Sequence, residues 1–487
     1  MAPTTSWWRR RFAIVSAACL AYAVGSGLPT PPTTSSGCRV IVEANASATS
    51  VSLFLPGGST DSSDLLVLDG FASVPGDLAK QGPSTAYNSI KTAFHKVVER
   101  IPEENRPMCS VHLYATGSMR SLPSEEQKAI YDALAVDFQK DESVPLVLER
   151  NHLETLTADE EAYYVVLSAN ILAKRVGSDL EPTDLELYGS LDLTQASSQI
   201  VVDVEHRWRY NSRKKSFGSS RPLRRIDFFA LTFSNFGRHS LLAQVSSLLE
   251  AKNSTENPCL FKGSNDDANR TGGGDAVACL QLVQQLVDTS NAKCATDTYC
   301  ALDAISQPRL SGPYFAFGDF YRMALFAKDV LHLTTPIPTV PFDFPTPALA
   351  EITQAAKVVC SEPFDRVQAL PSADSTRCLD LCYTSVLLKQ FGFTDDEKRV
   401  MYVEELHDEP IRWTRGVYWS LQVEARQAYE TALGDYLSAQ VDMGLPVGWN
   451  LALLVLVFAI VALVNLVHRA SNNGTTHALE FVHDASQ

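Results

Sequence analysis

The feature that most restricts how this chain folds is an uncharged apolar run near its C-terminus. Residues 447–467 read VGWNLALLVLVFAIVALVNLV, which is long enough to cross the ~30 Å hydrocarbon core of a bilayer as a helix. His468 and Arg469 follow this run, and basic residues mark the cytosolic side of a membrane span. The sequence therefore predicts a transmembrane helix over 447–467 and a cytosolic tail over 468–487.

The N-terminal segment 1–29 also bears on compartment. Arg9, Arg10 and Arg11 precede an apolar run over 12–28, which is the pattern of a signal peptide or of a signal anchor, and its small residues leave both open. The chain between the two segments is then lumenal or extracellular, where disulfides and N-glycans form. Sequons stand there at Asn45, Asn253 and Asn269, and a fourth, at Asn473, falls in the predicted cytosolic tail.

The charge balance limits the partners of the chain. Its 487 residues include 41 Lys and Arg against 56 Asp and Glu, a formal net charge of −15. Because phosphate backbones are held mainly by clustered Lys and Arg, we expect no nucleic acid partner, and a divalent cation should mediate contact with an anionic substrate. With 45% hydrophobic residues, the chain is not disordered, and its length predicts at least two cores.

Alternating strands and helices predict an α/β protein. The apolar, β-branched runs 38–42 and 51–55 are typical of a hairpin, and apolar residues at helical spacing follow over 83–101. The alternation continues with a strand at 111–115, helices at 124–138 and 160–176, and a second hairpin made of 185–193 and 199–204.

The two predicted hairpins resemble each other. Glu43 ends a strand with Ser47 four residues on, and Asp192 ends a strand with Ser197 five residues on. A carboxylate at a strand end can hold a metal's water shell, and loop amides and hydroxyls can hold phosphate oxygens. Two such loops facing each other would bind a polyphosphate from both sides. Asp, Asn and Ser are also frequent at hairpin tips for turn reasons alone, so this pattern leaves an ordinary turn open.

Several common catalytic motifs are absent. The sequence has no Gly-x-Ser-x-Gly, no His-Glu-x-x-His, no Walker loop and no paired Cys-x-x-Cys. Zinc and serine-triad chemistry are therefore disfavoured.

The order of segments resembles the ecto-apyrase family, the membrane-bound nucleoside triphosphate diphosphohydrolases. The resemblance rests on LYATGSMRSL (113–122), LTADEEAYYVVLSANIL (156–172) and LDLTQASSQI (191–200), whereas the family's first region is matched at 43–50 only by Ala44 and Ser47. Further matches follow in order: NPCLFKG (257–263), Cys279, the stretch 294–321 ending in GPYFAFGDFY, Cys360 with Cys378, LLKQFGFTDDE, and IRWTRGVYWSL around Trp413.

This resemblance implies a fold of two actin-like (RNase H-like) lobes with a nucleotide in the cleft between them, flanked by N- and C-terminal membrane segments. Lobe I would comprise 38–158, completed by 415–440, and lobe II, stapled by disulfides, would comprise 159–414. The disulfides expected by resemblance are Cys259–Cys279, Cys294–Cys300 and Cys360–Cys378. No partner is assigned to Cys38, Cys109 or Cys382.

The resemblance also implies roles for individual residues. Glu161, the position of the family's general base, would orient and deprotonate a water that Ser197 holds. Glu43 and Asp192 would bind Ca²⁺ or Mg²⁺ through waters. The residues expected at the nucleotide and its phosphates are Ser47, Thr116, Arg120, Gln199, Tyr321 and Phe391, with Phe320 and Phe393 as other candidates for stacking on the base.

Two functions follow from these expectations. The first is a membrane-anchored, metal-dependent hydrolase of nucleoside di- and triphosphates, facing the lumen of an endomembrane compartment such as the Golgi or the cell exterior. It would have the lipid bilayer as a partner and would form a homo-oligomer through its membrane spans. The alternative is a catalytically impaired relative that binds nucleotide or serves as a structural ectodomain, because the family's loop glycines are replaced by Asn45, Ala48, Thr194 and Gln195.

Overall fold

The computed structural model describes residues 38–442 apart from 57–64, 205–221, 291–299, 335–339 and 372. The chain divides into two compact units. One is Thr34–Val423, and the other contains both chain ends. Of the second unit, the helical residues 424–442 are described. Within the described residues no helix is long and apolar enough to cross a membrane. The predicted segments 1–29, 447–467 and 468–487 lie outside the described residues.

A five-stranded mixed sheet forms the first half of the Thr34–Val423 unit, in the order β3-β2-β1-β4-β5. Its central strand β1 runs antiparallel to β2 and parallel to β4. Side chains alternate across a strand, so Val40 and Val42 face one core and Ile41 faces another. The strands are β1 (Arg39–Ala44), β2 (Ala48–Pro56), β3 (Leu65–Pro75), β4 (Ser110–Ala115) and β5 (Leu153–Thr155).

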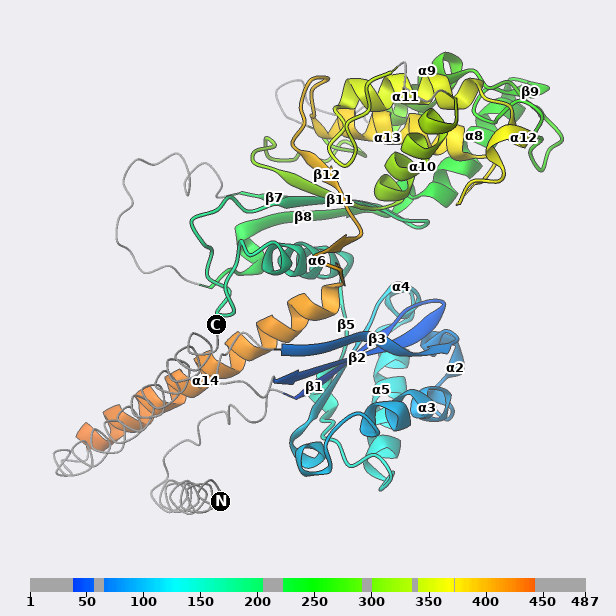
Figure 1. Ribbon diagram of the computed structural model, residues 1–487. Coiled ribbons are helices and arrows are strands. Elements are labelled where there is room, and N and C mark those ends of the chain that lie inside the picture. Colours follow the sequence, from blue (N-terminus) through cyan, green and yellow to red (C-terminus); the bar gives the residue numbers. More distant parts are fainter. Residues whose placement is uncertain are drawn as a thin grey trace, which may run out of the picture. The chain divides into compact units, whose positions relative to one another are not determined.

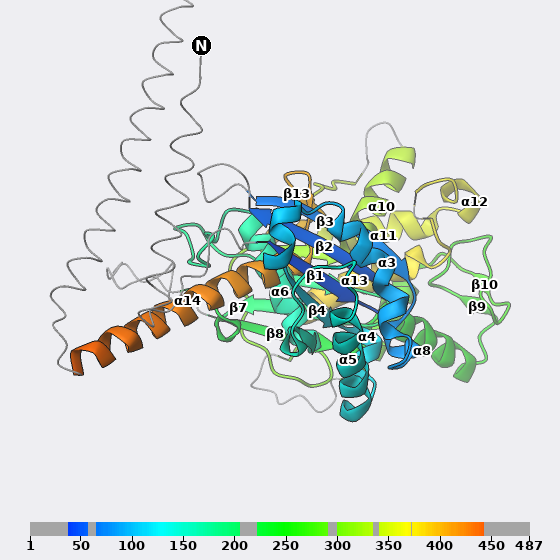
Figure 2. The same ribbon diagram turned by 90° about the horizontal axis from the view of Figure 1, so that it is seen from below.

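Helices α3 (Ala86–Val98) and α5 (Ser124–Gln139) cover one face of this sheet, as both views show (Figures 1 and 2). Phe94 of α3 and Phe138 of α5 meet edge to face, with ring centroids 5.1 Å apart, a preferred arrangement for aromatic pairs. The smaller elements here are α2 (Leu78–Gln81), η2 (Glu103–Met108), α4 (Gly117–Arg120) and η3 (Arg150–His152).

Helix α6 (Ala158–Leu172) and the first part of α14 (Trp413–Asp442), up to Val423, pack beside the strands. The ring of Tyr418 stacks on Phe54 of β2 with centroids 4.6 Å apart. A Cβ at Gly416 would lie 2.3 Å from the carbonyl oxygen of Tyr164, so only glycine permits this approach of α14 to α6.

The second sheet repeats the strand order of the first. Its order, β8-β7-β6-β11-β12, has the same sequence of antiparallel and parallel neighbours around the central strand β6. Strand β6 is therefore the counterpart of β1, and the β6–β7 turn is the counterpart of the β1–β2 turn. The strands are β6 (Gly189–Leu193), β7 (Ser198–Asp203), β8 (Phe228–Phe233), β11 (Tyr314–Gly318) and β12 (Val400–Tyr402).

A large helical core lies beside this second sheet, where α9, α10, α11 and α13 gather near β11 (Figure 1). The helices are α8 (Arg238–Ala251), α9 (Ala276–Ser290), α10 (Asp319–Thr334), α11 (Leu349–Ser361), α12 (Phe364–Val367) and α13 (Arg377–Phe391). Short elements complete it: η4 (Arg225–Asp227), η5 (Ser234–Phe236), β9 (Glu256–Asn257), β10 (Thr271–Gly272), β13 (Glu405–Leu406) and β14 (Glu409–Pro410).

Disulfides staple both halves. The expected pairs Cys259–Cys279 and Cys360–Cys378 are confirmed. A third disulfide, Cys38–Cys109, ties the start of β1 to the start of β4 and was not assigned from sequence. The expected Cys294–Cys300 bond involves Cys294, which lies outside the described residues.

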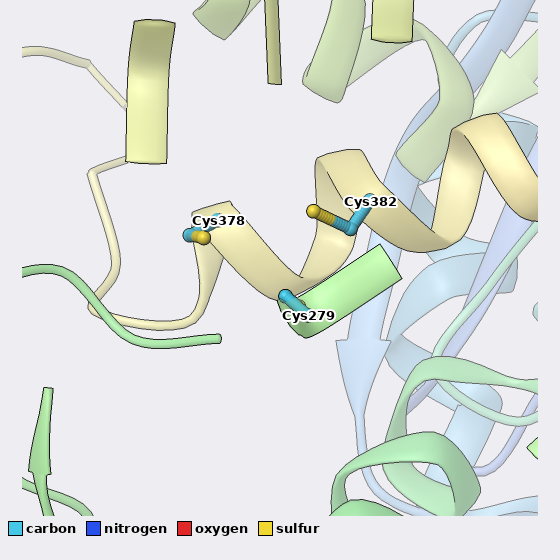
Figure 3. Close-up of side chains that lie close together, drawn as sticks. All are labelled: Cys279, Cys378 and Cys382. Atoms are coloured by element: carbon cyan, nitrogen blue, oxygen red, sulfur yellow. The ribbon is translucent and has the colours of Figure 1, made fainter. Parts of the chain in front are cut away.

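Cys382 is a buried free thiol between two of these disulfides. The sulfurs of Cys279, Cys378 and Cys382 lie within 4.8 Å of one another (Figure 3). Because Cys279 and Cys378 are already oxidised, they cannot serve as thiolate ligands, and this cluster is a packing feature of the core.

Candidate active site

Two acidic residues occupy equivalent places in the two sheets. Glu43 lies near the end of β1 and Asp192 near the end of β6, each just before the turn into the next strand. Asp192 pairs with Gln199 across the hairpin, as Glu43 pairs with Ser50. The duplicated topology therefore presents the same two-part unit twice, an acid followed by a tight turn.

Glu161 lies in the first turn of α6. The residues at the N-terminus of this helix determine where it begins. The hydroxyl of Thr157 accepts from the amide of Glu160, and the Glu160 carboxylate accepts from the amide of Thr157, which together form a capping box. Nη1 of Arg120, the last residue of α4, donates to Oε2 of Glu161 at 3.0 Å and to the carbonyl oxygen of Leu156 at 3.0 Å. Arg120 thus holds Glu161 in place from α4.

Electrostatic coupling connects Glu161 with both acids. Burial, followed by the charge of Glu161, raises the pKa of Glu43, whereas Arg412 opposes this shift. Burial and then Glu161 raise the pKa of Asp192 to about 7. The charge of Glu161 therefore raises the pKa of both acids. Carboxylate oxygens are the ligands that Ca²⁺ and Mg²⁺ prefer, so this donor set fits a divalent cation.

The Asn45 side chain closes the turn between β1 and β2, which we call the first turn. Oδ1 of Asn45 accepts hydrogen bonds from the amide of Ser47 at 2.9 Å, the amide of Ala48 at 2.8 Å and the Ser47 hydroxyl at 2.9 Å. The Asn45 side chain also opposes the rise in the pKa of Glu43. An Asn that caps amides two and three residues ahead forms a stable local turn without glycine.

Thr194 closes the turn between β6 and β7, which we call the second turn, in the same way. Its Oγ1 accepts from the amides of Ser197 at 3.0 Å and Ala196 at 3.2 Å. The N-terminus of α8 supports this turn, because the amide of Arg238 donates to the carbonyl oxygen of Thr194 at 3.0 Å. A Cβ at Gly237 would lie 2.2 Å from the carbonyl carbon of Ala196, so the helix reaches the turn only because this residue is glycine.

A buried ionic network anchors the second turn. The Arg238 guanidinium donates to both carboxylate oxygens of Asp380, at 2.9 and 3.0 Å, and to Asp374 at 2.7 Å. On the other side of the turn, Nε2 of Gln195 donates to Asp319 at 3.3 Å. Nε of Arg322 donates to the same Asp319 at 2.9 Å.

The turns that follow β4 and β11 also correspond. Gly117, with φ of +39°, follows Thr116, whose amide donates to the carbonyl oxygen of Ala44 at 2.9 Å. Gly318, with φ of +59°, lies against Asp192. Each of these turns therefore contacts the acid-bearing hairpin of its own sheet.

A cavity of about 490 Å³ opens beside Glu43. Its lining comes from β1, α6, the β13–β14 hairpin and the start of α14, and includes Glu404, Glu405, Arg412 and Trp413. A larger cavity of about 750 Å³, lined by α9, α11 and α13 with Asp288, Lys389 and Asp395, contains none of the predicted site residues.

The structure links four of the residues singled out in the sequence. Glu43, Asp192, Glu161 and Arg120 are linked by contacts or electrostatic coupling. Ser47 and Ser197 lie in the two turns, Thr116 is buried at the end of β4, and Gln199 is buried on β7 opposite Asp192.

The aromatic candidates are placed differently. Phe391 is 0% exposed and packs against Phe233 in the helical core, so a base could not reach its ring. Phe320 and Phe393 are also buried, because α10 and the end of α13 turn their apolar faces into that core. Tyr321 is half-buried beside Phe344, with centroids 6.2 Å apart, and stays a candidate.

Sequence reasoning missed the residues that support the turns. Arg238, Asp319 and Arg322 lie far along the chain from the turn that they support, and although Asp319 belongs to the matched segment GPYFAFGDFY, none of the three was given a role. Asn45 was noted as a sequon and a replacement for glycine, and Thr194 only as a replacement for glycine. Their spacing to the following amides, two and three residues, was the available signal of capping.

Comparison with known proteins places the chain in a family. Residues 40–431 match the GDA1/CD39 (nucleoside phosphatase) family. The chain belongs to this family, and the resemblance to the ecto-apyrases is confirmed.

Individual relatives agree. The chain is 22% identical over 375 residues to ectonucleoside triphosphate diphosphohydrolase 2 of Mus musculus, covering 70% of this chain and 72% of that protein. It is 22% identical over 435 residues to ectonucleoside triphosphate diphosphohydrolase 3 of Mus musculus, covering 78% and 77%. A solved structure of nucleoside triphosphate hydrolases from Neospora caninum superposes with a TM-score of 0.52 at 14% identity, covering 88% of this chain and 99% of that chain. The chain is thus a divergent member with a mixed α/β fold.

Proposed function

We propose that this chain is a divalent-cation-dependent hydrolase of nucleoside di- and triphosphates that releases the terminal phosphate by attack of water. One observation carries the proposal: Glu161 is held by Arg120 and couples electrostatically to both Glu43 and Asp192, the acids that precede the two equivalent turns. Membership of a nucleoside phosphatase family supports the same chemistry.

In the proposed reaction Glu161 accepts the proton of the attacking water, and the Ser197 hydroxyl holds that water. Arg120 donates to Oε2 of Glu161, so Oε1 is the oxygen that we assign as proton acceptor. General-base assistance of this kind is worth roughly 10²- to 10⁴-fold in rate. The remainder is positioning and charge neutralisation, since phosphoryl transfer to water needs no covalent intermediate.

Glu43 and Asp192 would hold the Ca²⁺ or Mg²⁺ ion. Their raised pKa values record the cost of gathering carboxylates in a buried place, and a cation removes that cost. When bound, the ion would neutralise charge on the phosphates. Ser47, Thr116, Arg120 and Gln199 are proposed to contact the phosphates, and Tyr321 is proposed to contact the base.

We further propose that the protein is anchored in a membrane by 447–467, with the active site facing the lumen or the cell exterior. The disulfides seen among the described residues support an oxidising compartment for this part of the chain.

Phosphate release by the purified full-length protein tests the activity. ATP, ADP, GDP and UDP would each be offered with Ca²⁺, with Mg²⁺ and with a chelator. We expect release that requires the cation. Absence of release from every nucleotide would contradict the hydrolase.

The alternative function is that of a nucleotide-binding relative without catalysis. A ligand that binds only the folded state raises its melting temperature. Nucleotide-dependent thermal stabilisation without phosphate release would therefore identify this second function.

A further inference from the structure

The amides of both turns already have partners within the chain. Asn45 occupies the amides of Ser47 and Ala48, and Thr194 occupies those of Ala196 and Ser197. Both caps arise at equivalent positions of a duplicated hairpin, one directly after each acid-bearing strand. Backbone amides in such turns are the groups that bind phosphate oxygens where a turn is open.

We infer that Asn45 and Thr194 are internal competitors of the substrate phosphates, and that they set a weak affinity for nucleotide in an otherwise assembled site. This inference rests on the proposed function. A phosphate oxygen that approaches either turn must displace a side-chain oxygen that the amides already bind at 2.8–3.2 Å. The net free energy of phosphate binding at the turn is therefore only the difference between a hydrogen bond to a charged acceptor and one to a neutral acceptor.

The two capping residues have different surroundings. The amide of each bonds within its own turn, Thr194 to the carbonyl oxygen of Ser197 at 2.9 Å and Asn45 to the carbonyl oxygen of Ala48 at 3.0 Å, and the carbonyl oxygen of Thr194 also accepts from the Arg238 amide at 3.0 Å. The Asn45 side chain lies close enough to the Glu43 carboxylate to oppose the rise in its pKa. Rotation of Asn45 would thus change the first turn and the surroundings of Glu43 together.

The test replaces each cap with glycine, the residue that opens a turn without adding a side chain. Asn45→Gly and Thr194→Gly should each lower the KM for nucleotide about fivefold, with kcat little changed, since a charged hydrogen bond exceeds a neutral one by about 1 kcal/mol and 1.4 kcal/mol is tenfold. Thr194→Ser and Asn45→Ser are the matched controls. Both keep an oxygen that can cap the turn, and Asn45→Ser also removes the sequon at Asn45, which separates an effect of glycan from one of capping.

Thermal melting without nucleotide is the second measurement. Loss of a cap should lower the melting temperature of the glycine variants but not of the serine variants. If the glycine variants melt lower yet bind nucleotide with unchanged or higher KM while the wild type is active, the inference is wrong and the proposed function stands. If the wild type and all variants neither release phosphate nor gain thermal stability from nucleotide, both fail together.

Discussion

Gly318 and Asp192 lie so close together that position 318 has no room for a side chain. A Cβ there would be 2.4 Å from Oδ1 of Asp192 and 2.5 Å from the carbonyl oxygen of Leu193, on a backbone with φ of +59°. The end of β11 is therefore shaped around one of the two acids that we assign to the cation.

Gly318→Ala should displace the Asp192 carboxylate and strain the turn, lowering kcat/KM at least tenfold. The reason is twofold, since alanine disfavours this positive φ and its methyl group overlaps Oδ1. Gly434→Ala is the control, because nothing lies within 4 Å of its Cβ position in α14 and alanine favours a helix. Equal activity of the two variants would show that Asp192 does not need its present position.

Arg238→Met should destabilise the fold by about 3 kcal/mol in urea unfolding, because it leaves Asp380 buried with less compensation. Asp380 has a pKa raised to about 6 by burial despite its contacts with Arg238. In the double variant Arg238→Met with Asp380→Leu the charge is gone, so much of the loss should be recovered. A double variant as unstable as the single one would mean that packing, not charge, is what Arg238 supplies.

His112 should make the first half of the unit sensitive to acid. Burial, then the charges of His152 and Arg39, lower the pKa of His112 to about 3, against about 6.5 in an unfolded chain. The unfolded state therefore binds the extra proton between these values. The stability from neutral His112 is complete above about pH 6.5 and is lost progressively as the pH falls toward 3.

Melting curves at pH 7 and pH 5 measure this contribution when wild type is compared with His112→Gln. We expect the fall in melting temperature over that interval to be smaller in the variant. Equal falls in both proteins would assign the acid sensitivity to other groups.

The sequons should differ in occupancy when the protein is made in a eukaryotic secretory host. Asn253 and Asn269 are exposed on turns and should carry glycans. The Asn45 side chain is engaged by Ser47 and Ala48, and we predict that it stays unmodified. Mass spectrometry of the glycopeptides decides, and a glycan on Asn45 of active protein would contradict the proposed role of the first turn.

Cys382 should be unreactive until the helical core opens. Burial, followed by the nearby charges of Asp275 and Asp380, raises the pKa of its thiol to about 12, and the thiolate is the reactive form. Alkylation at pH 8 should label the Cys382 peptide only after addition of denaturant. Labelling of the native protein would indicate an exposed thiol.

The parts of this fold that depend on the residue pattern of short segments could be predicted from the sequence. Alternating apolar residues predicted β1 and β2 within a few residues, and the match between the segments ending in Glu43 and Asp192 anticipated the duplicated hairpins. These signals can be read from the sequence because strand periodicity and the spacing from an acid to the following turn are properties of short segments.

Long-range relationships could not be read in the same way. The Cys38–Cys109 bond joins residues 71 apart, and only the parallel pairing of β1 with β4 brings them together. Phe391 looked like other aromatic candidates, yet its environment is set by the helices around α13. Whether Asn45 and Thr194 crowd the turns or cap them depends on side-chain rotamers that no pattern specifies.

The most direct measurement of the central claim compares Glu161→Gln with Glu160→Gln. Both variants remove one negative charge from the first turn of α6, and glutamine at position 160 preserves the capping box. We predict that Glu161→Gln still gains thermal stability from nucleotide and cation but releases phosphate at least a hundredfold more slowly, while Glu160→Gln keeps wild-type turnover. Wild-type turnover by Glu161→Gln would contradict the account.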